Sequence, residues 1–171
     1  MKEQTACYDA KALRRGYLSL LLRITVLAAA LGLFFSLVCM LWRVQGQDMV
    51  PAVRDGDLLL AWRMGKDFGR GDVVVYQAEG QRRVGRVAAL GGDAVEITED
   101  GKLLVNNAIQ SESIYYPTQT EQGELSLSLP EGSLYILGDY RTACRDSRDF
   151  GPVPAESIEG KVIGLLRVRG F

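Results

Sequence analysis

The residues that could perform chemistry in this 171-residue sequence do not include histidine. Without an imidazole, the chain cannot use a Ser-His-Asp or Cys-His arrangement, a His-ligated metal or a histidine pH switch. Any catalytic group must therefore be a Ser, Thr, Lys, Tyr, Cys or carboxylate side chain. The three cysteines, Cys7, Cys39 and Cys144, form no CxxC pair and no metal-ligand cluster. The sequence thus predicts no metal and no cofactor.

The charge of the chain is balanced overall but unevenly distributed. There are 20 Lys and Arg residues against 21 Asp and Glu residues, which gives no electrostatic reason to expect a nucleic-acid partner. Residues 1–42, however, hold five basic and two acidic residues, so the rest of the chain is net acidic. The basic end directly precedes the most apolar part of the sequence.

That apolar part, residues 24–42, contains 19 consecutive residues without a charge. As a helix it would be about 29 Å long, close to the hydrocarbon thickness of a bilayer. A cleaved secretory signal has a shorter apolar core, and a buried core helix rarely runs this long without a charge on its polar face. We therefore expect an uncleaved, single-pass anchor in the cell membrane, with a cytoplasmic tail over residues 1–23 and an extracellular domain over residues 43–171.

Beyond the predicted anchor, short runs rich in Val, Leu and Ile are separated by Gly, Asp, Asn and Pro, a pattern typical of β-strands. The runs cover residues 58–62, 73–76, 84–90, 95–98, 103–105, 134–137 and 162–168. Asp100-Gly101, between two such runs, predicts a hairpin with a type I′ turn. Residues 110–130 are polar and interrupted by Pro and Gly, which indicates a long loop or small insertion. We expect a mainly β protein with one compact antiparallel β domain.

Four ordered segments of this domain resemble the conserved boxes of the type I signal peptidases, membrane-anchored proteases with a Ser nucleophile and a Lys general base. Gly-Gln-Asp-Met-Val-Pro at 46–51 with Arg-Asp-Gly-Asp at 54–57 is similar to the Ser-Met-x-Pro box and its trailing Gly-Asp. Arg-Gly-Asp-Val-Val-Val-Tyr at 70–76 forms the second segment, and residues 85–93 are similar to the Lys-Arg-Val box. Residues 138–151 resemble the box written Gly-Asp-Asn-Arg-x-x-Ser-x-Asp-Ser-Arg-x-x-Gly. The resemblance implies a β domain of the signal-peptidase type behind one transmembrane helix.

The chain departs from this family pattern at all three positions of the proton-relay machinery. Asp48 stands where the family has its nucleophilic Ser, Gly85 where it has the Lys base, and Cys144 where a Ser helps to position that Lys. The frame around these positions is retained, and its residues are expected to form the peptide groove or its structural support. They are Met49, Pro51, Arg86, Asp139, Arg141, Asp146, Ser147 and Arg148.

These departures lead us to expect that the chain is not an enzyme. Gly85 has no side chain to accept a proton, and an acidic group at Asp48 places negative charge where an oxyanion must develop. Two other chemistries stay open: Asp48 and Asp146 could share a proton as a carboxylate dyad, and Cys144 could act as a nucleophile. The plainer alternatives are an Asp146 ion pair with Arg141 or Arg148, and a Cys144 side chain that only fills space.

Within this family, the chain resembles more specifically the catalytically incomplete signal-peptidase-like proteins that some Gram-positive bacteria use with sortases to assemble covalent pili. This resemblance implies a membrane-tethered chaperone or scaffold that binds an extended segment of a pilin subunit, a class C sortase or both. The two other hypotheses are an active type I signal peptidase and a purely structural membrane-anchored protein.

Overall fold

The computed structural model describes residues 10–110, 118 and 125–167, and it divides the chain into a helical unit that ends at Leu37 and a β unit that begins at Val38. Helix α1 runs from Ala10 to Val38. Its part from Leu13 to Val38 is long and apolar enough to cross a membrane by length and composition. The apolar side chains described along it are mostly exposed, as a lipid-facing helix requires.

The helical boundaries differ from the predicted span over residues 24–42. The helix begins 14 residues earlier, inside the predicted tail, and it ends at Val38, because Cys39–Arg43 forms strand β1. Strand β1 pairs with β2 (Leu58–Trp62) along its whole length, and the carbonyl of Val38 accepts a hydrogen bond from the Arg63 amide at 2.9 Å. These backbone bonds stop the helix although the sequence stays apolar. Residues 1–9 of the predicted tail lie outside the described residues.

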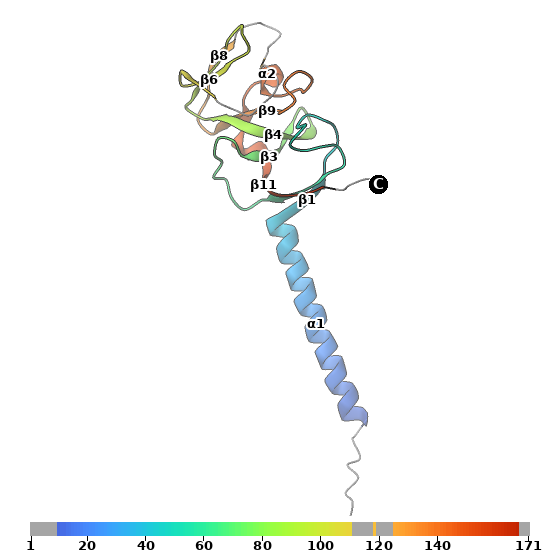
Figure 1. Ribbon diagram of the computed structural model, residues 1–171. Coiled ribbons are helices and arrows are strands. Elements are labelled where there is room, and N and C mark those ends of the chain that lie inside the picture. Colours follow the sequence, from blue (N-terminus) through green and yellow to red (C-terminus); the bar gives the residue numbers. More distant parts are fainter. Residues whose placement is uncertain (1–9, 111–117, 119–124, 168–171) are drawn as a thin grey trace, which may run out of the picture. The chain divides into compact units, whose positions relative to one another are not determined.

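The β unit contains two antiparallel sheets (Figure 1). The larger has the strand order β1-β2-β11-β3-β4-β9-β10, and the smaller has the order β7-β6-β5-β8. The elements not yet given bounds are β3 (Val73–Ala78), β4 (Gln81–Leu90), β5 (Ala94–Ile97), β6 (Leu103–Val105), β7 (Ala108–Ile109), β8 (Leu125–Ser128), β9 (Ser133–Leu137), α2 (Ser147–Phe150), β10 (Val153–Pro154), the 3₁₀ turn η1 (Ala155–Ser157) and β11 (Ile158–Leu166). The predicted antiparallel β domain is therefore confirmed.

The turns explain the register of the hairpins. Gly101 has a φ of 74°, but the preceding Asp100 is not in the positive-φ region, so the predicted type I′ turn is wrong. Instead, the Gly101 amide donates to the Thr98 carbonyl at 2.8 Å, and Lys102 closes the three-residue loop by accepting from the Thr98 amide at 3.0 Å. Two-residue loops with both φ values positive occur at Glu79-Gly80, between β3 and β4, and at Asn106-Asn107, between β6 and β7.

One strand lies inside the segment predicted as a loop at residues 110–130. Strand β8 pairs with β5 from Ala94 to Ile97, and its Leu125 and Leu127 pack against the core of the smaller sheet. The alternation Leu-Ser-Leu-Ser is a strand pattern in which one face is apolar. Apart from residues 110, 118 and 125–130, the segment lies outside the described residues.

The two sheets meet at Asp93, between β4 and β5. Its carboxylate accepts hydrogen bonds from the Leu90 amide at 2.8 Å, from Arg70 Nη2 at 2.6 Å and from Asn106 Nδ2 at 2.9 Å. Burial raises the pKa of Asp93, but the Leu90 amide, Arg70 and Asn106 outweigh that effect, so the net pKa is lowered. Asp93 thus ties the end of β4 to the turn after β6.

We predict that Asp93→Ala destabilises the β unit by about 2 kcal/mol, because three donors lose their acceptor. Urea unfolding of the full chain in detergent micelles, followed by circular dichroism, measures this loss. The contribution of Asp93 should be complete above the ordinary carboxyl pKa near 4 and should disappear as the pH falls through the lowered folded-state value. Asp100→Ala, in an exposed turn, is the matched control and should change stability by less than about 0.5 kcal/mol. Equal effects of the two variants would refute the assigned role of Asp93.

Candidate peptide groove

Asp48 lies in the turn that follows β1, and its backbone is fixed to a distant part of the chain. Its carbonyl accepts a hydrogen bond from the Tyr140 amide at 2.9 Å. The carboxylate is half-buried and makes no hydrogen bond or ion pair within the described part of the chain. Burial raises the pKa of Asp48, the Arg83 guanidinium lowers it, and the charge of Asp146 raises it, with a net upward shift.

A groove of about 430 Å³ opens beside Asp48, a volume within the range of ligand sites. Its walls come from the end of β1, the turn after it and the first part of β4. The lining residues are Trp42, Val44, Gln45, Asp48, Gln81, Arg82, Arg83 and Val84. Within the described residues, β9 pairs with β4 from Arg86 to Leu90, so the stretch of β4 that lines the groove pairs with β3 alone.

Gly85 lies on β4 in a space that neighbouring side chains fill. A Cβ atom built on Gly85 would be 2.5 Å from Ile136 Cγ2, 3.2 Å from Tyr76 Cε1 and 3.3 Å from the Leu137 carbonyl oxygen. Ile136 and Tyr76 are both buried. The glycine therefore leaves no open pocket, because the Ile136 methyl group occupies the volume that a side chain at position 85 would enter.

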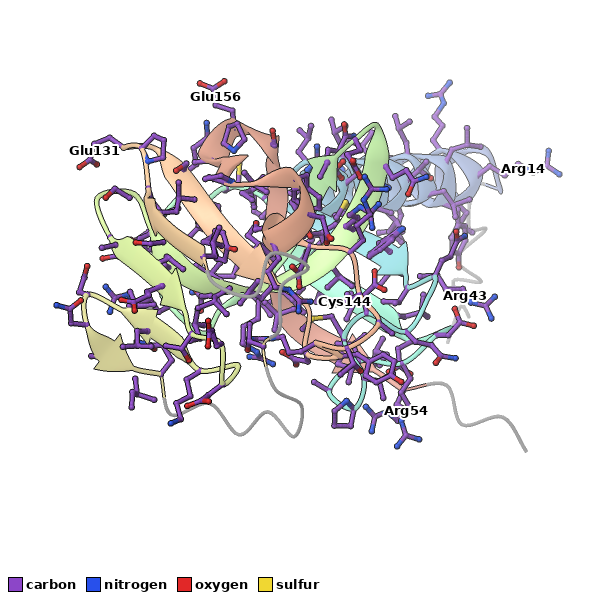
Figure 2. The ribbon with its side chains drawn as sticks, turned by 90° about the horizontal axis from the view of Figure 1, so that it is seen from above. Arg14, Arg43, Arg54, Glu131, Cys144 and Glu156 are labelled. Carbon is purple, nitrogen blue, oxygen red and sulfur yellow. The ribbon has the colours of Figure 1, made fainter. Side chains whose placement is uncertain are left out.

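Cys144 lies against Gly138, the residue that follows β9. A Cβ atom on Gly138 would be 2.5 Å from Cys144 Sγ and 2.7 Å from the Asp48 carbonyl oxygen, so the absence of a side chain at Gly138 lets the two segments meet. The thiol donates to Asp146 Oδ2 at 3.2 Å and accepts from Arg148 Nη2 at 3.3 Å. Figure 2 shows Cys144 among the side chains of the β unit, whereas Arg54 and Glu131 extend outwards.

The Cys144 thiol is held in its protonated form. Burial raises its pKa to about 12, and the negative charge of Asp146 and the hydrogen bond to it act in the same direction, against the guanidinium of Arg148. A thiol attacks as its thiolate, so this environment disfavours a nucleophilic role for Cys144.

Asp146 is a buried ion-pair partner and the N-cap of α2. Its carboxylate accepts from the Gly138 amide at 3.0 Å, from the Arg148 amide at 3.0 Å and from Arg148 Nε and Nη2 at 2.8 and 2.9 Å. Of the two ion pairs considered from the sequence, the structure has the one with Arg148. Because both oxygens of Asp146 are already occupied, the site disfavours a proton shared with Asp48.

The other retained residues form the frame behind the groove. Arg86 holds Asp139 through two bonds of 2.9 and 2.7 Å, and buried Arg141 donates to the Gly138 carbonyl at 2.7 Å. The Ser147 hydroxyl accepts from the Ile136 amide at 3.0 Å. Met49 is buried in the core beside β1, and Pro51 is exposed in the turn that follows Asp48.

Sequence reasoning identified Asp48 but missed the rest of the groove lining. Arg83 is the most consequential omission: its side chain is only 14% exposed, and its guanidinium lies 6.0 Å from the ring centre of Phe150. Alternation along β4 offers a signal, because Arg83 and Gly85 lie two residues apart and therefore on one face of the strand. Within the described residues, no group of three His, Cys, Asp or Glu side chains could hold a metal ion.

We predict that Cys144 resists alkylation in the folded chain. A pKa of about 12 in place of 9.0 lowers the thiolate fraction at neutral pH by about a thousandfold. Iodoacetamide labelling of the full chain in micelles, read by peptide mass spectrometry, should show Cys144 unlabelled while the same residue labels readily in urea. Rapid labelling of the folded protein at Cys144 would contradict the assigned environment.

We predict that Gly85→Ala destabilises the β unit by about 1–3 kcal/mol, because the new Cβ meets Ile136 Cγ2. Combining it with Ile136→Ala, which deletes Cγ2, should recover part of this loss in a double-mutant cycle. Ile136→Val is the matched control, because valine keeps both γ-methyl positions and should give no recovery. Additive effects in both cycles would show that Ile136 does not fill this space.

Several proteins of known name are similar to this chain. Signal peptidase I of Bacillus caldolyticus is 32% identical over 136 residues, covering 70% of this chain and 74% of that protein. The mitochondrial ATP-independent inner membrane protease subunit 1a of Arabidopsis thaliana is 36% identical over 132 residues, covering 73% and 67%. The crystal structure of a signal peptidase I from Enterococcus faecalis V583 is 28% identical with a TM-score of 0.49, covering 56% of this chain and 96% of that one.

Other relatives are considerably longer than the matched region. The chain spans 36% and 39% of the thylakoidal processing peptidases 2 and 1 of Arabidopsis thaliana, the first of which is named as probable, and 64% of the mitochondrial protease subunit 1b.

These names contradict the expectation that the chain is not an enzyme. The relatives are peptidases and proteases by name, which points to an enzyme. The expectation rested on residues 48 and 85, and their replacement removes one proton-transfer route without excluding hydrolysis by another. The family model for signal peptidases, peptidase S26, matches residues 17–166 and so includes most of α1, the groove and the frame behind it. This chain belongs to the signal peptidase family.

Proposed function

We propose that this chain is a membrane-anchored processing peptidase that acts on precursor polypeptides at the outer face of the cell membrane. The observation that carries the proposal is the half-buried Asp48 carboxylate, at the family's nucleophile position, in the wall of a groove beside an edge of β4. The similarity to named signal peptidases supports it. Under this proposal the N-terminus is cytoplasmic and the β unit is extracellular, as the basic flank before the anchor favours.

The side chains present at the groove limit which residues could take part in hydrolysis. A Ser–Lys route is not available at positions 48 and 85, and the Cys144 thiol is held protonated. Asp48 is the groove carboxylate that is left to accept a proton, and its raised pKa makes it a stronger base than an ordinary carboxylate. In the proposed step, Asp48 takes a proton from a water that attacks the peptide carbonyl and returns it to the leaving amine.

The backbone of β4 supplies a means of binding the substrate. An extended peptide that lies beside Gln81–Val84 would pair with the strand edge that β9 leaves open, with side chains entering the groove. Arg83 contributes positive charge close to Asp48, which favours the ionised carboxylate and is suitably placed to counter negative charge that develops on the substrate.

A second candidate function is the binding of a pilin segment, of a class C sortase or of both during pilus assembly. The specific observation in its favour is the packing at Gly85, where Ile136 and Tyr76 occupy the place of the family's Lys side chain. A groove of this shape retains a peptide-binding edge whether or not a bound segment is cut. In this candidate the chain acts as a chaperone or scaffold for the assembling subunits.

We predict that the full chain in lipid vesicles cleaves an exported precursor with small residues before the cleavage site, and that Asp48→Asn abolishes the cleavage. The amide keeps the shape of the side chain but cannot accept the proton. Mass spectrometry of the products identifies the cut bond, and Asp67→Asn, in an exposed loop, is the matched control that should retain activity.

Cleavage that persists in Asp48→Asn would refute the role of Asp48. A precursor that binds but stays intact would overturn the peptidase and support the assembly function, which a deletion strain tests by the loss of polymerised pili while signal cleavage continues. If the precursor neither binds nor is cleaved, the result overturns both the peptidase and the assembly function and favours a purely structural membrane protein.

A further inference from the structure

Three charged residues line the groove, and they differ in whether they form an ion pair with another residue of this chain. Arg82 forms an ion pair with Glu159 at 2.7 Å. Arg83 lies 3.5 Å from Glu79 and donates to the Gln81 side-chain oxygen at 3.3 Å. Asp48 has no such partner among the described residues. Glu79 is shared with Arg145, which lies closer to it at 2.5 Å. Of the three charged residues that line the groove, Asp48 is thus the one without an ion pair among the described residues.

Arg83, whose charge lowers the pKa of Asp48, makes its contacts with other groups. Arg83 Nη1 donates weakly to the Arg145 carbonyl at 3.4 Å, and the guanidinium faces the Phe150 ring. The other charge that acts on Asp48 is Asp146, which Arg148 neutralises at 2.8 Å. Arg83 therefore reduces the negative potential at Asp48 without forming a contact ion pair, and Asp48 remains one of the residues that line the groove.

The remaining lining residues suit a compact cation. Trp42 provides an aromatic ring, which attracts cations through its face, and Gln45 and Gln81 provide amide oxygens as acceptors. An ammonium group carries three donors on a flexible stem, which matches one carboxylate and two amide oxygens. Val44 and Val84 give the apolar surface along which the four-carbon stem of a lysine would lie.

We propose that the groove selects peptides that carry a lysine, whose ammonium pairs with Asp48. This inference rests on the proposed function only in placing the peptide in the groove along the first part of β4. It names a requirement for one side chain of the bound segment, and it assigns to Asp48 a recognition role in addition to any part in hydrolysis. The lysine of the bound peptide thus provides the cationic partner that Asp48 lacks among the described residues of this chain.

The test uses the full chain in detergent micelles and fluorescein-labelled peptides built from Ala, Val and Ser. A single Lys is moved through each central position, and each Lys peptide is matched by one with norleucine, which keeps the stem without the charge, and by one with Glu. Fluorescence anisotropy, recorded before cleavage accumulates, gives the dissociation constants. At one position the Lys peptide should bind about tenfold more tightly than its norleucine partner, and the Glu peptide should bind most weakly.

Variants assign the preference to Asp48. Asp48→Asn should reduce the Lys-to-norleucine ratio to about one while the norleucine affinity stays unchanged, which shows that the groove remains folded. Asp67→Asn should keep the full preference.

The outcomes separate this inference from the proposed function. Equal binding of the Lys, norleucine and Glu peptides, with precursor cleavage intact, overturns the inference alone. A Lys preference that Asp48→Asn removes, in a protein that cleaves no precursor, supports the inference and overturns the peptidase. A Lys preference that survives Asp48→Asn also refutes the inference, and the absence of binding by every peptide overturns both.

Discussion

The groove depends on the buried ion pair between Asp146 and Arg148. Asp146 is 1% exposed, and its two oxygens collect donors from α2, from Gly138 at the end of β9 and from the Cys144 thiol. Removing one partner of such a pair leaves a buried charge and typically costs about 3–5 kcal/mol. The pair therefore fixes the segment from Gly138 to α2, and through the bond from Tyr140 to the Asp48 carbonyl it also fixes the turn that carries Asp48.

The sequence was sufficient for the features that depend on local pattern. Short runs rich in Val, Leu and Ile located most strands of the larger sheet to within a few residues, and the resemblance located the frame from Arg86 to Arg148. Features decided by distant contacts were not predictable. The end of α1 at Val38 depends on pairing with β2, about 20 residues later, and the apolar composition of residues 39–42 gives no sign of it. The filling of the space at Gly85 depends on Ile136, which has no local relation to that glycine.

Proton transfer and ligand binding are affected differently by the residues at positions 48 and 85. For proton transfer, the resemblance implies that a Ser nucleophile and its Lys base are absent. For ligand binding, Asp48 gives the groove a negative charge that a serine would not have. The structure adds that this charge is unpaired whereas those of Arg82 and Asp146 are paired. Under the two proposals, binding specificity and proton transfer are separate properties of one carboxylate.

The contact between Gly85 and Ile136 also limits the paths by which sequences of this kind can change. A lysine at position 85 meets the Ile136 methyl group, and a smaller residue at position 136 leaves a cavity while position 85 is still glycine. Each substitution alone therefore passes through a less stable protein, and the effect of either depends on the identity of the other residue. The order of mutations consequently matters, and a chain with this pair of residues is separated from a lysine-bearing ancestor or descendant by a barrier in folding stability.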